Sequence, residues 1–222
     1  MPNITAIIPA FNEAPRIGHA LAALLASGCF QEIIVIDDGS TDQTHSVAAA
    51  FPVHVLRLHS NQGKGAAMAA GVAASSADIY FFCDADILGL QPLTIQAVLQ
   101  PVIDGKLDMF IAMRDRPIFH IAPWLSHRVP LLGGERAVTA RLWHQVPNRY
   151  KQGFRIEAAL NFYARYYGHG LGSRVITGLT QTIKEKKYGL FPGFFQRIFM
   201  SCQVGLTYLR LFWEHITGLI AK

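Results

Sequence analysis

The stretch FFCDADI, residues 81–87, guides the interpretation of the whole chain. Two phenylalanines and a cysteine are typical of the end of a buried strand, and Asp84 and Asp86 follow at once, one residue apart. Carboxylates in such a place are costly to bury unless a partner compensates their charge. Mg²⁺ and Mn²⁺ prefer oxygen ligands and often bridge carboxylates to substrate phosphates. The pair therefore indicates a metal site, with a solvated turn as the alternative.

Apolar runs and helical patterns alternate before this stretch. We expect strands at residues 4–9, 33–36, 53–59 and 79–83, with helices near 15–27, 41–50 and 64–75. This order predicts an α/β domain with a largely parallel sheet. In such sheets ligands bind at the carboxyl ends of the strands. Polar clusters follow each of these strands, namely Asn12 with Glu13, Asp37 with Asp38, residues 61–65, and Asp84 with Asp86.

The segments IIPAFNE, VIDDGSTDQT, NQGKGAAMAAG and CDADI carry a resemblance. In order and spacing they resemble the successive motifs of the family 2 nucleotide-sugar glycosyltransferases, which have the GT-A fold. The match covers about residues 4–115 and includes a similarity to polyprenyl-phosphate glycosyltransferases and glucosyl-phosphoglycerate synthases. The resemblance implies a hexosyltransferase that uses a UDP- or GDP-sugar and Mg²⁺ or Mn²⁺.

The resemblance also assigns roles to residues by position. Asp86 would ligate the metal and act in catalysis, with Asp84 as the second metal ligand and as a contact to ribose or sugar. Lys64 would neutralise phosphate charge, although a solvated loop lysine is the alternative. For Asp37 and Asp38 the alternative is helix capping. The expected donor-binding residues are Pro9, Ala10, Glu13, Asp37, Asp38, Gly63, Lys64, Asp84 and Ala85.

The segment LLGGERAVTARLW, residues 131–143, resembles the acceptor side of the family site. We expect Gly133, Gly134 and Arg136 to bind an acceptor phosphate at the start of a helix, because backbone amides there and an arginine suit an anion. An ordinary helix cap with a surface ion pair is the alternative. Glu135 and Glu157 are the candidates for a general base, which an inverting transfer to a hydroxyl needs.

The remaining second half has weaker signals. Helices are predicted near 94–100 and 153–170, and strands at 107–116 and from Val175. The irregular residues 117–130, with His120 and His127, are predicted to form an acceptor lid. Many relatives place a histidine after the last strand, where this chain has Gln181 and Lys184. This leaves the third protein ligand of the metal open.

The C-terminal part predicts a long amphipathic helix. We expect a GT-A domain at residues 1–190 and the helix at 191–222. Contact with the inner membrane leaflet, with Lys184–Lys187 against anionic lipid, is one interpretation. Packing on the catalytic domain or in a homodimer is the other.

Composition narrows the functional classes. The formal net charge of +5 suits an anionic partner, but no basic stripe interleaved with aromatic residues supports nucleic-acid binding. Three dispersed cysteines and the absence of a signal-peptide pattern predict a cytoplasmic protein, with peripheral membrane contact left open. The expected acceptor is a lipid-linked phosphate. The alternatives are a small soluble phosphorylated acceptor, used by a retaining enzyme that needs no base, and a degenerate nucleotide-binding module.

Overall fold

The computed structural model describes residues 1–115, 133–181 and 190–218, with side chains described outside 181–200. In these ranges seven strands form one sheet in the order β3-β2-β1-β4-β7-β6-β8. The strands are β1 (Ile4–Ala10), β2 (Glu32–Asp37), β3 (His54–Arg57), β4 (Ile79–Phe82), β6 (Met109–Arg114), β7 (Arg136–Thr139) and β8 (Leu171–Ile176). Strands β3, β2, β1 and β4 are mutually parallel, and β7 is antiparallel to both of its neighbours. The predicted α/β architecture is confirmed.

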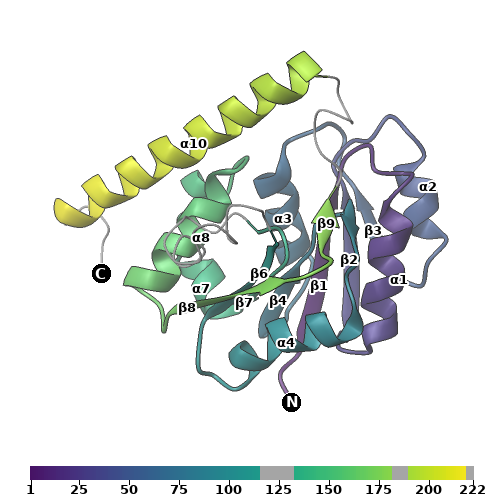
Figure 1. Cartoon of the computed structure of the whole chain (residues 1–222), viewed down its shortest axis with the longest axis horizontal. Helices are drawn as coiled ribbons and strands as arrows, with labels where there is room; N and C mark the ends of the chain where they lie inside the picture. Colours follow the sequence, from purple (N-terminus) through teal and green to yellow (C-terminus); the bar gives the residue numbers. More distant parts are fainter. Residues whose placement is uncertain (116–132, 182–189, 219–222) are drawn as a thin grey trace.

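Helices cover both faces of the sheet (Figure 1). They are α1 (Ile17–Ser27), α2 (Thr44–Ala49), α3 (Lys64–Ala73), α4 (Pro92–Ile103), α7 (Ala140–Gln145), α8 (Arg155–Tyr166) and α10 (Leu190–Ile216), with a short 3₁₀ turn η1 (Asn148–Tyr150). Side chains alternate across a strand, so Ile7 and Phe82 enter the core under α3 and α8, while Ile8 and Phe81 enter the core under α1 and α4. The sheet therefore has one apolar core on each of its two faces.

A second, two-stranded sheet lies beside the paired aspartates. It joins β5 (Ile87–Leu88), directly after Asp86, to β9 (Thr180–Gln181), with Ile87 opposite Gln181. The segment in which many relatives have a histidine thus begins next to the predicted metal site. Lys184 itself lies outside the described residues, as do the predicted lid at 117–130 and its histidines.

One local prediction is wrong. We expected Gly133 and Gly134 to lead directly into a helix, but Arg136–Thr139 form strand β7 and the helix α7 begins only at Ala140. The β-branched Val138 and Thr139 favour a strand, and β7 fills the place between β4 and β6. Thr139 then caps α7, since its hydroxyl accepts a hydrogen bond from the Leu142 amide.

The long C-terminal helix is confirmed as an element. Val204, Leu211 and Glu214 of α10 are buried, and Phe212 packs edge-on against Phe162 of α8 at 5.2 Å between ring centroids. Packing on the catalytic domain, one of the two interpretations, therefore holds for one face of this helix. The division into domains 1–190 and 191–222 stays a prediction.

Among the residues that the structure describes, no helix is both long and apolar enough to cross a bilayer.

Candidate functional site

The loops after β1, β2 and β3 meet at the carboxyl edge of the sheet. The Asp38 carboxylate accepts hydrogen bonds from the backbone amides of Gln62 and Gly63, both at 2.8 Å. The amide of Asn12 in turn donates to the Ser40 hydroxyl at 3.0 Å. Segments far apart in sequence are thus fixed to one another, and the predicted convergence of the polar clusters is observed.

Lys64 connects this edge to α8. Its ammonium group lies 2.7 Å from Asp84 Oδ1 and 2.6 Å from Glu157 Oε1. Lys64 opens α3 directly after Gly63, whose φ of +88° is a conformation that favours glycine. The turn therefore aims the lysine inward, and the interpretation of Lys64 as a solvated loop residue is wrong for this structure.

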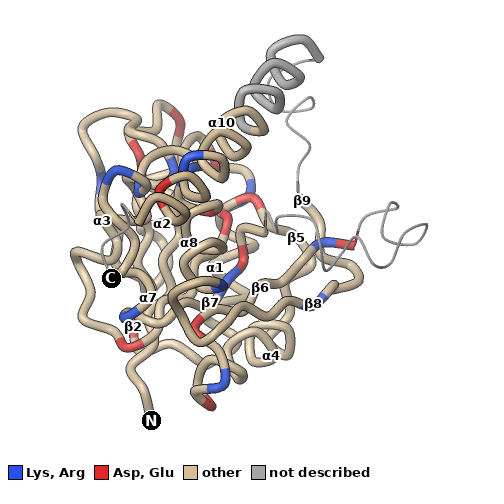
Figure 2. Tube along the Cα trace, turned by 90° about the vertical axis from the view of Figure 1, so that its left-hand side faces the viewer, with Lys and Arg blue, Asp and Glu red and all other residues tan. Residues whose placement is uncertain are grey.

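Arg114 completes the cluster from the end of β6. Its guanidinium lies 3.0 Å from Asp84 Oδ2 and 3.4 Å from Glu135 Oε1. Basic and acidic residues accordingly lie close together in the interior beside α8 (Figure 2). Sequence reasoning missed Arg114, although a basic residue at the end of an apolar strand at the ligand-binding edge was the available signal.

Gly134 lets the turn before β7 approach Asp84. A methyl group at this position would lie 2.0 Å from Asp84 Oδ2, which no side chain can do. Of the two glycines predicted for the acceptor side, Gly134 therefore lies against Asp84, whereas Gly133 lies against Ala112 and Ile111 of β6. The backbone of the turn forms one wall of the same site.

Arg136 lies deeper than the sequence suggested, with 1% of its surface exposed. Its Nε donates to the Gly133 carbonyl at 3.0 Å, and its Nη2 lies 3.6 Å from Glu157 Oε2. The guanidinium thus holds the Gly133–Gly134 turn from behind. The alternative of a surface ion pair at a helix start does not describe this residue.

Burial and charge together set the protonation of the cluster. Burial opposes ionisation of Asp84, but Lys64 and Arg114 outweigh it and lower the Asp84 pKa to about 2. Burial likewise opposes the charge on Lys64, yet Asp84 and Glu157 raise its pKa. For Glu135 burial dominates, the Asp84 charge adds to it, and the pKa rises to about 7. Glu135 Oε2 is buried without a hydrogen-bond partner among the described residues.

The remaining predicted donor residues surround this cluster. Asp37 is fully buried at the end of β2, accepts from the Ser40 amide at 2.9 Å and lies 3.3 Å from Arg57 Nε. This hydrogen bond supports the turn after β2 but does not cap a helix, because α2 begins only at Thr44. Glu13 is paired with Arg16 at 2.8 Å. Among the other predicted members, Pro9 and Ala10 lie at the end of β1, and Ala85 lies in the turn between β4 and β5.

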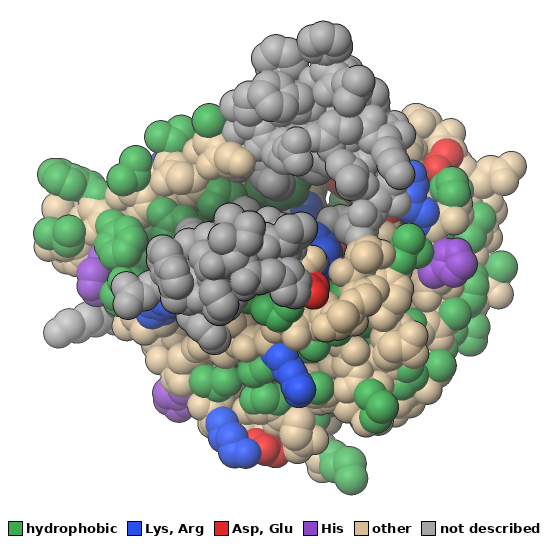
Figure 3. All heavy atoms as spheres, viewed as in Figure 1, with side chains coloured by type: hydrophobic (Ala, Val, Ile, Leu, Met, Phe, Trp, Pro, Cys, Tyr) green, Lys and Arg blue, Asp and Glu red, His purple; other side chains and the backbone are tan. Residues whose placement is uncertain are grey.

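The donor set at this edge suits a hard divalent cation. Asp84 and the largely buried Asp86 supply carboxylate oxygens, and a cation bound by Asp84 would take the place that Lys64 or Arg114 holds beside its oxygens. Over the described ranges no group of three or more His, Cys, Asp or Glu residues is placed to hold a metal ion. Mg²⁺ typically takes one or two carboxylates, keeps several waters and binds substrate phosphates, so a pair of aspartates fits this mode. Figure 3 shows cationic and acidic side chains in a hollow near the centre of this face.

Comparison with known proteins identifies a matching family and similar sequences. The sequence model described as "Glycosyl transferase family 2" matches residues 5–166. Glucosyl-3-phosphoglycerate synthase of Mycobacterium tuberculosis H37Rv is 32% identical over 112 residues, covering 46% of this chain and 35% of that protein. The enzyme of the same name from Mycolicibacterium smegmatis is 26% identical over 193 residues, covering 71% of this chain and 62% of that protein. The chain therefore spans between about a third and three fifths of the length of these relatives.

A solved structure shares the fold. The M. tuberculosis glucosyl-3-phosphoglycerate synthase in complex with Mn²⁺, UDP-glucose and phosphoglyceric acid superposes with a TM-score of 0.74 and 24% identity, covering 95% of this chain and 79% of that one.

Proposed function

The chain belongs to glycosyl transferase family 2, and from this premise we propose that it transfers a hexose from a nucleotide-diphosphate sugar, in the first place a UDP-sugar, to a phosphorylated acceptor. The observation that carries the proposal is the position of Asp84 between Lys64 and Arg114, with Asp86 two residues further on, at the carboxyl edge of the sheet. This arrangement offers both carboxylates for a cation and cations for a diphosphate.

Asp86 and Asp84 would hold Mg²⁺ or Mn²⁺ together with the donor. The bound metal would stabilise negative charge on the departing nucleotide diphosphate. Lys64 is held by Asp84 and Glu157 at the same edge, so its charge is fixed close to where the diphosphate would bind. Solved complexes of the mycobacterial enzyme with Mn²⁺ and with Mg²⁺ support this choice of metals.

The nucleoside would bind over the ends of β1 and β2. Asp38 fixes the loop at Gln62 and Gly63, and the backbone of Pro9 and Ala10 borders the same space. We assign Asp38 and this backbone to the base and ribose. Glu13 and Asp37 would support the pocket through their pairs with arginines and amides.

The acceptor would enter beside the Gly133–Gly134 turn. Because the Arg136 guanidinium is committed to the Gly133 carbonyl, we assign Arg136 to shaping the turn and the backbone of the turn to the acceptor contact. The names of the mycobacterial relatives favour a small phosphorylated hydroxy acid. A lipid-linked phosphate is the second candidate, because α10 presents an apolar outer face close to the domain.

Two carboxylates are available to orient or deprotonate an acceptor hydroxyl. Glu157 lies at the site edge and is held by Lys64, so its geometry is fixed. Glu135, with its pKa raised by burial to about 7, has a proton affinity suited to acid–base chemistry near neutral pH. An inverting reaction would use one of them, whereas a retaining reaction needs neither as base.

The test is calorimetric titration of UDP, UDP-glucose and GDP-mannose in the presence of Mn²⁺. We expect binding of one of them to depend on Mn²⁺ and to weaken about tenfold or more in Asp86→Asn, because a carboxylate ligand is lost. Asp104→Asn, which changes an exposed carboxylate after α4, is the matched control and should bind like the wild type. A folded protein that binds none of the nucleotides would contradict the donor site and favour a degenerate family member.

The acceptor is identified by product formation. Radiolabelled UDP-glucose would be incubated separately with 3-phosphoglycerate and with a polyprenyl phosphate. Label recovered in a water-soluble phosphorylated glucoside supports the first acceptor, and label extracted into organic solvent supports the second. Intact nucleotide binding without either product would exclude both acceptors while leaving the donor site in place.

A further inference from the structure

The outward face of α10 is apolar, the reverse of an ordinary surface helix. Leu206, Leu209, Trp213 and Ile216 recur at helical spacing and are 67%, 70%, 67% and 78% exposed. A surface helix normally turns its polar side to water. Here the buried side carries Thr207 and Glu214 beside Val204 and Leu211, while the exposed side carries the large hydrophobic residues. Figure 3 shows hydrophobic side chains along the edge of the molecule where Figure 1 places α10.

This apolar surface continues from α10 onto α8. Phe212 is 41% exposed and lies 5.7 Å, between ring centroids, from Tyr166 of α8, which is 42% exposed. The hydrophobic surface is therefore a continuous strip on two packed helices. Strips of this kind on a protein surface commonly mark an interaction site.

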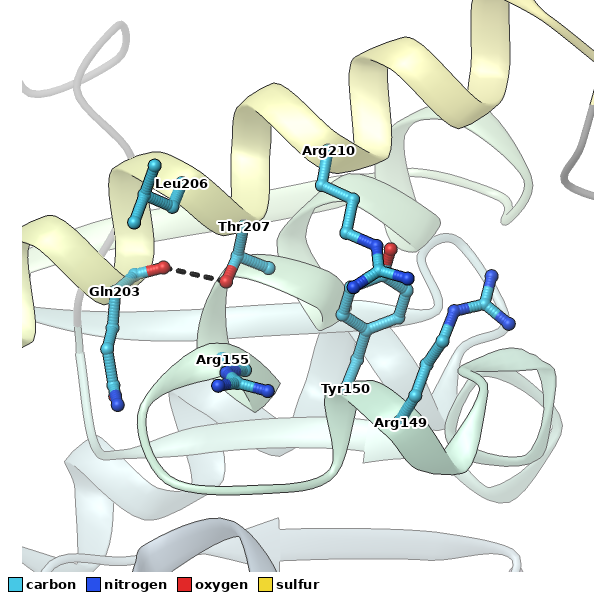
Figure 4. Close-up of a pocket in the computed structure, with 7 residues that line it drawn as sticks. All are labelled: Arg149, Tyr150, Arg155, Gln203, Leu206, Thr207 and Arg210. Carbon is cyan, nitrogen blue, oxygen red and sulfur yellow. Dashed lines mark hydrogen bonds between the residues drawn. The ribbon is translucent and has the colours of Figure 1, made fainter.

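An arginine-lined pocket adjoins the strip. Arg149, Arg155 and Arg210 surround a pocket of about 190 Å³, together with Gln203 and Leu206 (Figure 4). The pocket lies between η1, the start of α8 and the middle of α10. Leu206 belongs both to the pocket and to the apolar strip, so the cationic and apolar surfaces share a border.

The arginines carry more positive charge than their neighbours neutralise. Glu214 accepts from Arg149 at 2.9 Å and from Arg210 at 3.0 Å, and among the described residues Arg155 forms no ion pair with a carboxylate. The Tyr150 ring supports two of the three guanidinium groups, since the Cζ atoms of Arg149 and Arg210 lie 5.0 and 6.0 Å from its centroid. Such contacts hold the guanidinium groups in place while they stay accessible to solvent.

We propose that this strip and pocket form a docking surface for an anionic lipid bilayer. The strip would lie at the boundary between headgroups and acyl chains, and a lipid phosphate would enter the arginine pocket. Amphipathic helices bind in the plane of a membrane in this way, with apolar side chains inserted and basic residues at the level of the phosphates. Anionic leaflets attract such basic residues electrostatically.

The combination of charge and hydrophobicity selects this occupant over two others. A free phosphate compound would use the pocket but would leave the apolar strip exposed to water. A second copy related by a two-fold axis through α10 would place its own arginines close to this set, without added negative charge. A bilayer matches both surfaces at once. Membrane contact extends beyond the proposed transfer and does not depend on which acceptor the protein uses.

The experiment is vesicle flotation of the whole chain with vesicles of phosphatidylcholine alone or mixed with phosphatidylglycerol. We expect binding to the mixed vesicles and several-fold weaker binding to phosphatidylcholine alone. The variant Leu209→Ser/Trp213→Ser should lose about tenfold or more, since two inserting side chains are removed. Leu93→Ser, which changes a 77% exposed leucine on α4, is the matched control and should bind like the wild type.

The pocket is tested separately with Arg155→Gln, compared with Arg174→Gln on β8. Both arginines are exposed, so neither change is expected to affect folding, which circular dichroism would verify. We expect only Arg155→Gln to weaken binding to phosphatidylglycerol vesicles, with the difference shrinking at high salt. Equal effects of the two variants would overturn the role of the pocket.

Three further results would overturn the proposal. One is equal binding of wild type and Leu209→Ser/Trp213→Ser to the mixed vesicles. Another is calorimetric binding of inorganic phosphate that Arg155→Gln abolishes, in a protein that does not float with vesicles. The third is a dimer in light scattering that Leu209→Ser/Trp213→Ser converts to a monomer, again without vesicle binding.

Discussion

Lys64 neutralises the charges of two largely buried carboxylates, Asp84 and Glu157, so its side chain supports the fold as well as the site. We expect Lys64→Met to lower the free energy of unfolding by about 3 kcal/mol, because removal of one partner of a buried ion pair leaves charge without compensation. Asp84 keeps Arg114 in this variant, which limits the loss. Urea denaturation would measure the change.

The control for this prediction is Lys106→Met. The Lys106 ammonium lies 2.8 Å from Asp104, a distance like those of Lys64, but the pair is exposed to solvent and should contribute nothing measurable. The double variant Lys64→Met/Glu157→Gln should recover part of the stability, because one uncompensated charge is removed. Equal losses for Lys64→Met and Lys106→Met would show that the cluster is not electrostatically coupled to folding.

Glu135 makes the stability of the protein depend on pH, with the opposite sign to that of an ordinary ion-paired carboxylate. Its folded-state pKa of about 7 lies above the ordinary value of 4.5, so the folded state binds more protons between these values. Stability from this group is present at lower pH and is lost as the pH rises from about 4.5 to about 7, by on the order of 3 kcal/mol.

The measurement is the free energy of unfolding across this pH range, without added divalent metal, for the wild type and Glu135→Gln. Glutamine cannot ionise, so the wild type should become less stable relative to this variant as the pH rises. Asp84 does not interfere, because its lowered pKa of about 2 makes its contribution change only in more acidic solution. A constant difference between the two proteins over the range would contradict the prediction.

At the scale of elements, α10 has one buried and one exposed face. Truncating one leucine on each face would measure how much each face contributes to stability. Leu211 is fully buried against α8, and we expect Leu211→Ala to cost about 2–5 kcal/mol of unfolding free energy. Leu209 is 70% exposed, and Leu209→Ala should change stability by less than about 0.5 kcal/mol. Chemical denaturation of both variants would check the orientation of the helix. Similar costs for the two would mean that α10 is packed differently.

At the scale of the whole molecule, the core under α8 includes residues of α10. Leu211 belongs to the same apolar cluster as Ile7 of β1 and Phe82 of β4. We therefore expect α10 to unfold together with the sheet, so that amides around Leu211 exchange hydrogen with nearly the same protection free energy as those of β1. Native-state hydrogen exchange in low denaturant would measure this. Exchange of α10 at much lower free energy would instead support an independent unit at residues 191–222.

The sequence alone determined the architecture and predicted the edge of the sheet at which the candidate site lies. Apolar runs that end in Asp37, Asp84 and similar residues predicted parallel strands with a ligand edge, and the structure has that edge. These predictions succeeded because alternation of strands and helices, turn glycines and strand-end carboxylates are local patterns, and the topology of a parallel sheet brings strand ends together.

Only the tertiary structure decided which charges meet. Arg114 and Glu135 are 21 residues apart, and Lys64 and Glu157 are 93 residues apart, so no local pattern relates them. Strand β7 also required the tertiary structure, since its place between β4 and β6 overrode the helix signal that follows the glycines. The orientation of α10 was likewise decided only by the tertiary structure. Its sequence has apolar residues around most of the helix, and packing against α8 selected which of them are buried and which face outward.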